Sequence, residues 1–358
     1  MRHRGVIVWL TLIAALILTP VKEAIAEQSR VRLITTGGTI SNRPGGRLSA
    51  VELLASVPDL EDLIEAEAEE FANIPSSALT LDQWTQLARR VNEVFQTDPT
   101  LAGIVVTSGT DTLEELAYFL HLTVRHDRPV VVVGAMRRPD ALGYDGAANL
   151  RQALRVAGDA ESHGRGVLVV FNSEINSARE VTKTDALHLQ AFQSRHYGVL
   201  GAAARDRVIY YRRLERRHTA GTEFDVEQIS RLPRVEIVMA YQGASGDLIR
   251  AAVDRGADGI VIAGAGAGST SAGQRDAIAY AAEQGVSVVM TSRTGGGRIA
   301  PQRASAEPED NPAARAGNRR SRRISGEDLA PVKARVLLML ALTVSNDRDV
   351  IQRMFSEY

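Results

Sequence analysis

Short apolar runs alternate with amphipathic segments along most of the chain. The runs that predict β-strands are Val31–Ile34, Gly103–Val106, Val130–Val133, Val167–Phe171, Val235–Met239, Gly259–Ala263 and Val286–Met290. Strands that alternate with helices are typical of βαβ units, which build mostly parallel sheets. The pattern therefore predicts an α/β fold, and such folds bind ligands beyond the carboxyl ends of their strands.

Three of the segments between these strands begin with the spacing of a capping box, in which a serine or threonine precedes a glutamate or glutamine by three residues. The pairs are Ser49 with Glu52, Thr80 with Gln83, and Thr112 with Glu115. After Thr80, apolar residues recur at helical intervals, namely Leu81, Trp84, Leu87, Val91 and Val94. This spacing predicts a helix with one buried face.

A polar, arginine-rich stretch interrupts the alternation. We place a domain linker at residues 208–233, between a first domain at 27–207 and a second at 234–358. Both are expected to be α/β domains with mostly parallel sheets, the first larger, the second smaller and flavodoxin-like. A further polar stretch, 298–326, has almost no large apolar residue and is predicted to be a solvated loop.

The first 26 residues have the composition of a secretory signal. Arg2 and Arg4 give a basic start, Val6–Leu18 an apolar core, and Ala24–Ala26 a small-residue cleavage site. The core is shorter than the ~20 apolar residues of a membrane-spanning helix. We therefore expect a periplasmic or secreted protein that begins at Glu27 and makes no membrane contact after cleavage.

Composition narrows the class of partner. The 42 basic and 43 acidic residues give a formal net charge of -1, which provides no general attraction for nucleic acid or anionic membranes. The chain has no cysteine, so disulfides, thiolate metal sites and a thiol nucleophile are excluded. These facts favour a small-molecule partner.

Two turns at predicted strand ends carry unusual polar residues. TTGGTIS (Thr35–Ser41) has two glycines that allow a sharp turn and close approach to a ligand, so that Thr39 projects at the sheet edge. TSGTDTLEE (Thr107–Glu115) places Thr110 and Asp111 between a strand and a helix, near helix amides. Either turn alone is more often an ordinary cap. Together they supply what acyl transfer needs: a nucleophile, a cradle for negative charge, and a group that holds the substrate.

A hydroxyl nucleophile needs a base, and lysine is the candidate. Among the 42 basic residues only Lys22, Lys183 and Lys333 are lysines, and Lys22 leaves with the predicted signal. Lysine can lose its proton when buried, whereas arginine stays charged. Lys183, in REVTKTDA (Arg179–Ala186), is therefore the predicted base, although chance retention explains it equally well. Lys333, in a helical stretch, is expected to have no special task.

Other types of catalytic site find little support in the sequence. The chain has no HExxH pair, no GxSxG and no SxxK, which argues against zinc peptidases and the commonest serine hydrolases. GAGAGS (Gly264–Ser269) lacks the third glycine of a dinucleotide fingerprint and is predicted to be a turn. We expect neither a metal nor a cofactor.

Six motifs, in this order, resemble those of the bacterial L-asparaginase (asparaginase/glutaminase) family. They are TTGGTIS, SGTDTLEE, VVVVGAMRRPDALGYDGAANL (Val130–Leu150), VTKTDA, YGVLG (Tyr197–Gly201) and KARVLLMLAL (Lys333–Leu342). They cover nearly all of the chain after the predicted signal. The resemblance implies hydrolysis of asparagine, and to varying degrees glutamine, without metal or cofactor. It also implies a homotetramer built from close dimers.

The resemblance implies a role for each polar residue of the two turns. Thr39 is the nucleophile, which attacks the side-chain amide carbon, forms an acyl-enzyme and releases ammonia. Thr110, Asp111 and Lys183 form a second cluster, in which Lys183 and Asp111 tune the hydroxyl of Thr110. Asp111 also holds the α-amino group of the substrate, and water completes the hydrolysis.

Three further residues are implied to contact the substrate. Ser76, in NIPSS, binds the α-carboxylate, and Ser77 stands beside it where many members have glutamine. Ala135, in GAM, offers its backbone carbonyl to the leaving amide. These residues complete the predicted substrate-binding set with Thr110 and Asp111.

The chain departs from the family pattern at several places. The lid after the first motif, Asn42–Leu48, is short and has no tyrosine, although family members carry one close to the nucleophile. Ser108 replaces a common histidine, and Gly243 replaces an asparagine that reaches a neighbouring subunit. We identify no counterpart of the glutamate that contacts the neighbour's lid.

These departures leave the substrate open. The chain is expected to be an L-asparaginase, and the alternatives among enzymes are a glutaminase-asparaginase or an amidase for another small amide. Outside enzymes, the alternative is a non-catalytic periplasmic amino-acid-binding protein, because two α/β domains around a cleft also describe solute receptors. An intact set of Thr39, Thr110, Asp111 and Lys183 argues against that alternative.

Overall fold

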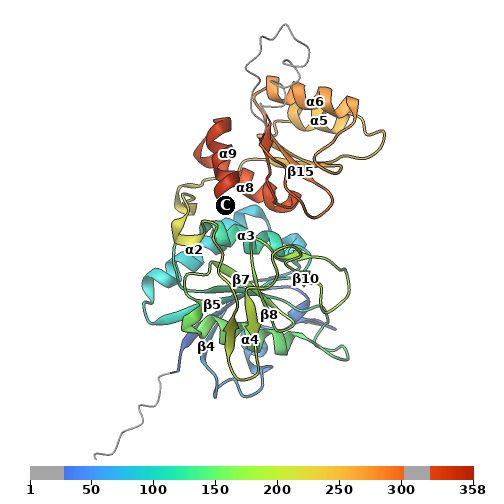
Figure 1. Ribbon diagram of the computed structural model, residues 1–358. Coiled ribbons are helices and arrows are strands. Elements are labelled where there is room, and N and C mark those ends of the chain that lie inside the picture. Colours follow the sequence, from blue (N-terminus) through green and yellow to red (C-terminus); the bar gives the residue numbers. More distant parts are fainter. Residues whose placement is uncertain (1–27, 302–322) are drawn as a thin grey trace, which may run out of the picture.

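The computed structural model describes residues 28–301 and 323–358, which form two sheets flanked by helices (Figure 1). The predicted signal and most of the predicted loop at 298–326 lie outside the described residues. In the described part of the chain, no helix is long and apolar enough to cross a membrane.

The first domain contains an eight-stranded sheet with the order β12-β11-β8-β7-β6-β5-β1-β4. Five neighbouring strands run parallel, namely β4 (Glu65–Ile74), β1 (Arg30–Gly37), β5 (Leu101–Thr107), β6 (Val130–Val133) and β7 (Val167–Phe171). The remaining three extend the sheet in antiparallel order, namely β8 (Glu174–Ser177), β11 (Gly201–Ala203) and β12 (Val208–Tyr210). The carboxyl ends of β1 and β5 therefore meet at one edge of the sheet.

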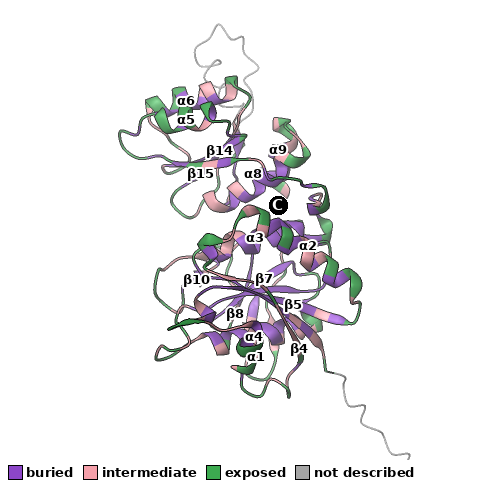
Figure 2. Ribbon diagram, turned by 180° about the vertical axis from the view of Figure 1, so that it is seen from behind, coloured by how far each residue is buried: buried purple, intermediate pink, exposed green. Residues whose placement is uncertain are grey.

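Helices cover both faces of this sheet (Figure 2). On one face lie α2 (Leu81–Thr97) and α3 (Leu113–Thr123), and on the other lie α1 (Ala50–Ala55) and α4 (Gly146–Gly158). Alternate residues of β5 point to opposite layers, because Val106 joins the cluster of α2 and α3 while Val105 joins the cluster of α1 and α4. The result is a three-layer α/β/α domain.

The second domain is smaller and has a four-stranded parallel sheet, ordered β13 (Val235–Met239), β14 (Gly259–Gly264), β15 (Ser287–Ser292) and β16 (Ile324–Ser325). Its helices are α5 (Asp247–Asp254), α6 (Ala272–Glu283), α8 (Pro331–Val344) and α9 (Arg348–Glu357). Helix α8 packs against α3 of the first domain, and one apolar cluster includes residues of both helices. The two domains therefore share a buried interface.

Several short strands and 3-10 turns lie outside the two main sheets. They are the strand pairs β2 (Asn42–Arg43) with β3 (Gly46–Arg47) and β9 (Thr182–Lys183) with β10 (Phe192–Gln193), and the 3-10 turns Thr39–Ser41, Ser76–Ala78, Ala160–Ser162, Thr219–Gly221 and Val226–Gln228. The segment expected to link the domains, 208–233, begins with β12 of the first sheet, and its Phe224 and Val226 are buried in the core.

All seven predicted strands are present, and β1, β5, β14 and β15 continue beyond their predicted carboxyl ends. The capping boxes of Ser49 with Glu52 and of Thr80 with Gln83 are confirmed. The third prediction is wrong, because the side chain of Thr112 does not cap α3. Glu114, in the first turn of that helix, instead bonds to residues of β9, as described below.

Strand β4 was not predicted, and it matters because Ser76 follows it. Its sequence, EAEAEEFANI, alternates glutamate with alanine, and its residues are only partly buried at the edge of the sheet. Glu67 pairs with Arg30 and Arg32 of the neighbouring strand. Cross-strand ion pairs therefore support this edge strand, where a weak apolar pattern gave no signal.

Candidate active site

Backbone contacts between glycines bring the two predicted turns together. A Cβ atom on Gly38 would lie 2.4 Å from the backbone nitrogen of Gly109, so only glycine allows the turns after β1 and β5 to approach this closely. Gly38 also has a φ of +93°, a conformation that favours glycine. Thr39 and Thr110 each follow one of these two glycines. The predicted nucleophile, Thr39, and the second threonine, Thr110, are therefore each one residue away from the place where the two turns touch.

The turns after β4 and β6 join the same point. A Cβ atom on Gly109 would lie 2.7 Å from Oγ of Ser76, and one on Gly134 would lie 2.5 Å from the backbone oxygen of Ser108. Ser76 is buried, with 5% of its surface exposed. The ends of four parallel strands of one sheet thus surround the site, as the fold class leads one to expect.

Lys183 connects the residues of the predicted second cluster. Its Nζ donates hydrogen bonds to Oγ1 of Thr110, at 3.0 Å, and to Oδ1 of Asp111, at 2.8 Å. The Thr110 residue is 6% exposed, whereas the side chain of Asp111 is 79% exposed. The structure therefore brings Lys183 to two predicted residues that lie 73 and 72 positions earlier in the chain, and it leaves the carboxylate open to a ligand.

The carboxylate of Glu114 positions Lys183 from the first turn of α3. Its Oε1 accepts hydrogen bonds from the backbone N–H of Lys183, at 3.1 Å, and from Oγ1 of Thr182, at 3.0 Å. This contact holds β9 against α3, and Thr110 and Asp111 lie in the turn just before that helix. The sequence motif TLEE contained Glu114, but helical spacing alone could not indicate its partner.

Lys333 has a structural task, contrary to the expectation from the sequence. It is 2% exposed, and its Nζ donates to the backbone oxygens of Arg179 and Val181, just before β9. Burial lowers the pKa of its ammonium group to about 8. A lysine of α8 therefore holds the segment that leads to Lys183, and the second domain supports the site through it.

Thr39 begins a single 3-10 turn, Thr39–Ser41, and is partly exposed. The backbone oxygen of Gly38 accepts bonds from Oγ of Ser41 and from the guanidinium of Arg47, each at 3.1 Å. The N-terminus of α3 follows Asp111, so its dipole favours negative charge near these turns. The backbone beside Thr39 is held by the side chains of Ser41 and Arg47.

The loop that carries Ala135 is braced by Asp145. The carboxylate of Asp145 accepts bonds from the backbone N–H groups of Met136 and Arg137, both at 2.9 Å, and from Nδ2 of Asn149, at 3.0 Å. Ala135 is fully buried beside this braced segment. Asp145 was missed in the sequence, although it lies inside a quoted motif.

Other residues singled out in the sequence lie in varied surroundings. Ser77 is exposed, unlike its neighbour Ser76. Ser108 is fully buried, and its hydroxyl donates to the backbone oxygen of Gly109 at 3.3 Å. The stretch Asn42–Leu48 forms the hairpin of β2 and β3, and Gly243 lies in an exposed turn with a φ of +75°.

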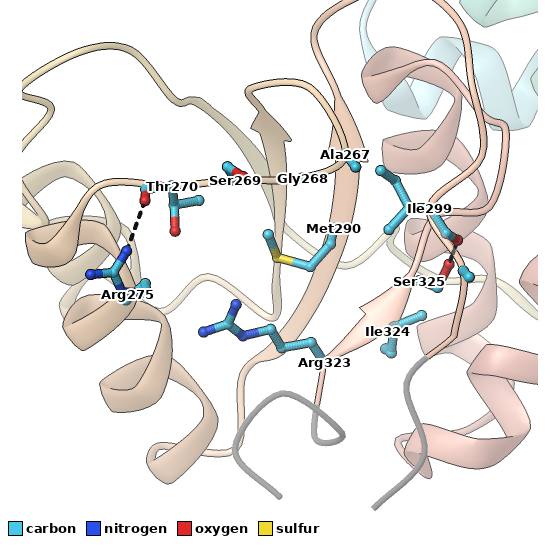
Figure 3. A pocket seen from close by; sticks show the side chains of 11 residues that line it. Ala267, Gly268, Ser269, Thr270, Arg275, Met290, Ile299, Arg323, Ile324 and Ser325 are labelled. Atoms are coloured by element: carbon cyan, nitrogen blue, oxygen red, sulfur yellow. Dashed lines mark hydrogen bonds between the residues drawn. The ribbon is translucent and has the colours of Figure 1, made fainter. Parts of the chain in front are cut away.

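A separate cavity of about 290 Å³ lies in the second domain (Figure 3). Arg275, Met290 and Arg323 are among the residues that line it. It contains none of the predicted site residues. The GAGAGS segment beside it is a turn, as predicted, because Ala265 and Ser269 exchange backbone hydrogen bonds.

Comparison with known proteins gives the family. The model for the N-terminal domain of asparaginase matches residues 30–216, and the model for the glutaminase/asparaginase C-terminal domain matches residues 234–355. "L-asparaginase 2" of Bacillus subtilis (strain 168) is 40% identical over 338 residues, which cover 92% of this chain and 86% of that protein. "Probable L-asparaginase periplasmic" of Haemophilus influenzae is 38% identical over 343 residues, covering 93% of this chain and 94% of that protein.

A solved structure supports the same assignment. The crystal structure described as a "Probable Cytoplasmic L-asparaginase" from Campylobacter jejuni superposes with a TM-score of 0.84 at 38% sequence identity. It covers 92% of this chain and 100% of that chain. Both domains and most of the length are thus shared with relatives of one kind, and the chain belongs to the bacterial asparaginase/glutaminase family of amidohydrolases.

Proposed function

We propose that this protein hydrolyses L-asparagine to L-aspartate and ammonia, with Thr39 as the nucleophile. One observation carries the proposal. Lys183 donates to both Thr110 and Asp111 at the place where the Gly38 and Gly109 backbones touch. This arrangement supplies an ionisable amine, two hydroxyl groups and an open carboxylate within one group of strand ends, as acyl transfer requires.

In the first step, Oγ1 of Thr39 attacks the side-chain carbonyl carbon of asparagine. The new oxygen–carbon bond forms, the carbon–nitrogen bond breaks, and ammonia leaves with the proton that the Thr39 hydroxyl gave up. Because Oγ1 of Thr110 accepts a bond from Lys183, its own proton is free to point toward the substrate. Positive potential from Lys183 and the start of α3 steadies the negative charge that develops.

Water then attacks the acyl-enzyme, and the Thr39 hydroxyl is restored as aspartate leaves. Lys183, Thr110 and Asp111 act in this step as in the first, because the same charge develops on the same oxygen. The substrate is held meanwhile by groups on other turns. Asp111 takes its α-ammonium, Ser76 its α-carboxylate, and the Ala135 carbonyl accepts from its amide.

The test is ammonia release from purified protein, with asparagine and glutamine as substrates and with Thr39→Ala as the comparison. We expect wild-type protein to release ammonia and aspartate and Thr39→Ala to lose nearly all activity with unchanged circular dichroism. Full activity in folded Thr39→Ala would show that another residue is the nucleophile. Tight amino-acid binding without ammonia release would favour the solute-binding alternative.

A glutaminase-asparaginase is the second candidate, and the lid favours it. The hairpin Asn42–Leu48 is short, and Arg43–Gly46 at its tip are exposed. A lid of this kind makes few contacts that would distinguish side chains differing by one methylene, a difference worth only ~1–3 kcal/mol in a pocket. The ratio of kcat/KM for asparagine to that for glutamine decides between the two.

The proposal includes assembly into a homotetramer. Strand β13 is an edge of the second sheet, and it presents Ile237, Met239 and the adjacent Tyr241 with 37%, 56% and 54% of their surfaces exposed. Neighbouring exposed apolar side chains at an edge strand are suited to contact between copies. Light scattering after size exclusion tests this, with Met239→Asp expected to weaken assembly.

We also propose that the protein is periplasmic or secreted. The support is the composition of residues 1–26 and the periplasmic name of the Haemophilus influenzae relative. The Campylobacter jejuni neighbour is described as cytoplasmic, so the family occurs with both descriptions. N-terminal sequencing of protein exported by its host is expected to begin at Glu27, and an intact Met1 would contradict the proposal.

A further inference from the structure

A tyrosine from a distant part of the chain holds the turn that begins with Thr39. The hydroxyl of Tyr144 donates a hydrogen bond to the backbone oxygen of Ile40, at 2.8 Å, across 104 residues of sequence. Ile40 follows Thr39 in the 3-10 turn and is fully buried. Any movement of this carbonyl also moves the backbone from which the Thr39 side chain leaves.

Tyr144 is itself held in place by its neighbours in the chain. A Cβ atom on Gly146 would lie 2.2 Å from the Tyr144 hydroxyl oxygen, so the tyrosine ring lies against the first residue of α4. Asp145, between them, braces the backbone of Met136 and Arg137 next to Ala135. One short segment therefore connects the turn of the proposed nucleophile with the loop of the proposed leaving-group carbonyl.

At neutral pH the hydroxyl of Tyr144 is protonated and acts as a hydrogen-bond donor. Burial raises the pKa of this hydroxyl above its ordinary value, and the negative charge of Asp145 raises it further. The group therefore stays protonated and does not act as a base. Its contribution is geometric, since a carbonyl oxygen such as that of Ile40 can only accept.

We propose that Tyr144 is a positioning residue for Thr39, which fixes the direction of the nucleophile through the Ile40 carbonyl. The inference rests on the proposed function of Thr39. It also accounts for a feature of the sequence, because the hairpin Asn42–Leu48 contains no tyrosine that could order the nucleophile from the other side. Here the tyrosine reaches the turn from the start of α4 and meets the backbone of Ile40.

The kinetic consequence is specific. Small displacements of a nucleophile lower the rate of the chemical step, because reaction needs a narrow range of distance and angle. The groups that would bind the substrate, Ser76 and Asp111, lie on other turns and do not depend on Tyr144. Loss of the Tyr144 hydroxyl should therefore lower kcat and leave KM nearly unchanged.

The experiment measures kcat, KM and the pH dependence of kcat/KM for asparagine in wild type, Tyr144→Phe and Tyr210→Phe, with Thr39→Ala as the inactive reference. Tyr210 is a matched control, because its hydroxyl is bonded to Oγ of Ser162 at 2.6 Å and it lies on β12, at the opposite edge of the same sheet. For Tyr144→Phe we expect kcat to fall about tenfold, with KM within about twofold and an unshifted pH profile. Tyr210→Phe should match wild type.

Gly146→Ala provides a second test that keeps the hydroxyl but displaces the ring. We expect the same selective loss of kcat, with circular dichroism and melting temperature recorded for every variant. The inference is overturned if Tyr144→Phe keeps wild-type kcat, if KM rises while kcat holds, or if the pH profile shifts. If wild type releases no ammonia, the proposed function fails and this inference fails with it. Active wild type with inactive Thr39→Ala and unaffected Tyr144→Phe would overturn this inference alone.

Discussion

The turn after β1 and the turn after β14 occupy equivalent places in their domains, each a glycine-rich segment at the carboxyl end of a parallel strand. The first meets other strand ends, because Gly38 packs on Gly109 and Gly109 packs on Ser76. The second closes on itself through backbone bonds between Ala265 and Ser269. The two domains thus have similar strand ends, but their glycine-rich turns make different contacts.

The difference lies in where the polar groups find their partners. In the first domain, Lys183 reaches across to Thr110 and Asp111, and Asp111 remains exposed. Around the second cavity, Arg275 donates to the backbone oxygen of Thr270, and the Ser325 hydroxyl donates to that of Ile299. A strand end becomes a reactive site when side chains from several turns converge there, and a glycine-rich turn alone does not achieve this.

The largest expected effect comes from removing the proposed nucleophile. Thr39→Ala should lower kcat for asparagine by roughly 10³-fold or more, because no acyl-enzyme can form. Ammonia release in steady state measures it. A Ser269→Ala variant of the equivalent turn in the second domain is the control and should keep wild-type activity. A smaller loss in Thr39→Ala than in that control would reverse the comparison.

Removing the amine should have the next largest effect. Lys183→Met keeps the length of the side chain and loses the donor to Thr110 and Asp111, so kcat should fall by roughly 10²-fold or more. The variant is expected to melt within a few degrees of wild type, since Asp111 is exposed and an exposed ion pair adds little stability. Wild-type kcat in this variant would remove Lys183 from the mechanism.

At acid pH the protein is expected to lose stability, and the activity lost through unfolding can be mistaken for a loss of catalysis. Burial lowers the pKa of His121 well below its ordinary value of 6.5, with the nearby His218 adding to the effect. Below pH 6.5 the unfolded chain binds protons that the folded chain does not, so stability falls as pH falls. Each such group removes up to ~1.4 kcal/mol of unfolding free energy per pH unit.

Chemical denaturation between pH 7.5 and pH 5 checks this expectation. In wild type the backbone N–H of Val167 donates a hydrogen bond to Nδ1 of His121, at 3.1 Å. The variant His121→Asn keeps an acceptor for this bond and removes the titratable group. The variant should be less stable at pH 7.5 and should lose less stability on acidification. An equal slope in both proteins would show that His121 is not the group that titrates.

The smallest effect is expected from a substitution at the cavity of the second domain. Arg275→Ala removes a guanidinium beside the second cavity, and its bond to the Thr270 carbonyl is exposed. Both kcat and KM should stay within about twofold of wild type, as for most surface substitutions away from a site. A tenfold change would show that the second cavity is coupled to catalysis.

Much of the fold could be predicted from local patterns. The buried strands were visible as apolar runs, because strands covered by helices on both faces contain few polar residues. Strand β4 was not, since it lies at the sheet edge with alternating glutamates that pair with arginines. An apolar pattern in the sequence indicates buried strands. It does not indicate an edge strand such as β4, which is supported by ion pairs.

The site was predictable as a set of residues more than as a network. The motifs singled out Thr39, Thr110, Asp111 and Lys183, and the structure brings the last three into direct contact. The supporting contacts of Glu114, Tyr144 and Lys333 span 69, 104 and 152 residues or more. No spacing rule reaches that far, because the contacts of Glu114 and Tyr144 depend on how the first domain folds, and those of Lys333 on how the two domains pack.

The proposed mechanism requires that the hydroxyl of Thr39 becomes acylated. The most direct measurement is mass spectrometry of peptides from protein quenched in acid during turnover of asparagine. We expect an ester-linked aspartyl group on the peptide that contains Thr39, and no such group in Thr39→Ala. The same group on the peptide that contains Thr110, with none on Thr39, would show that Thr110 is the nucleophile instead.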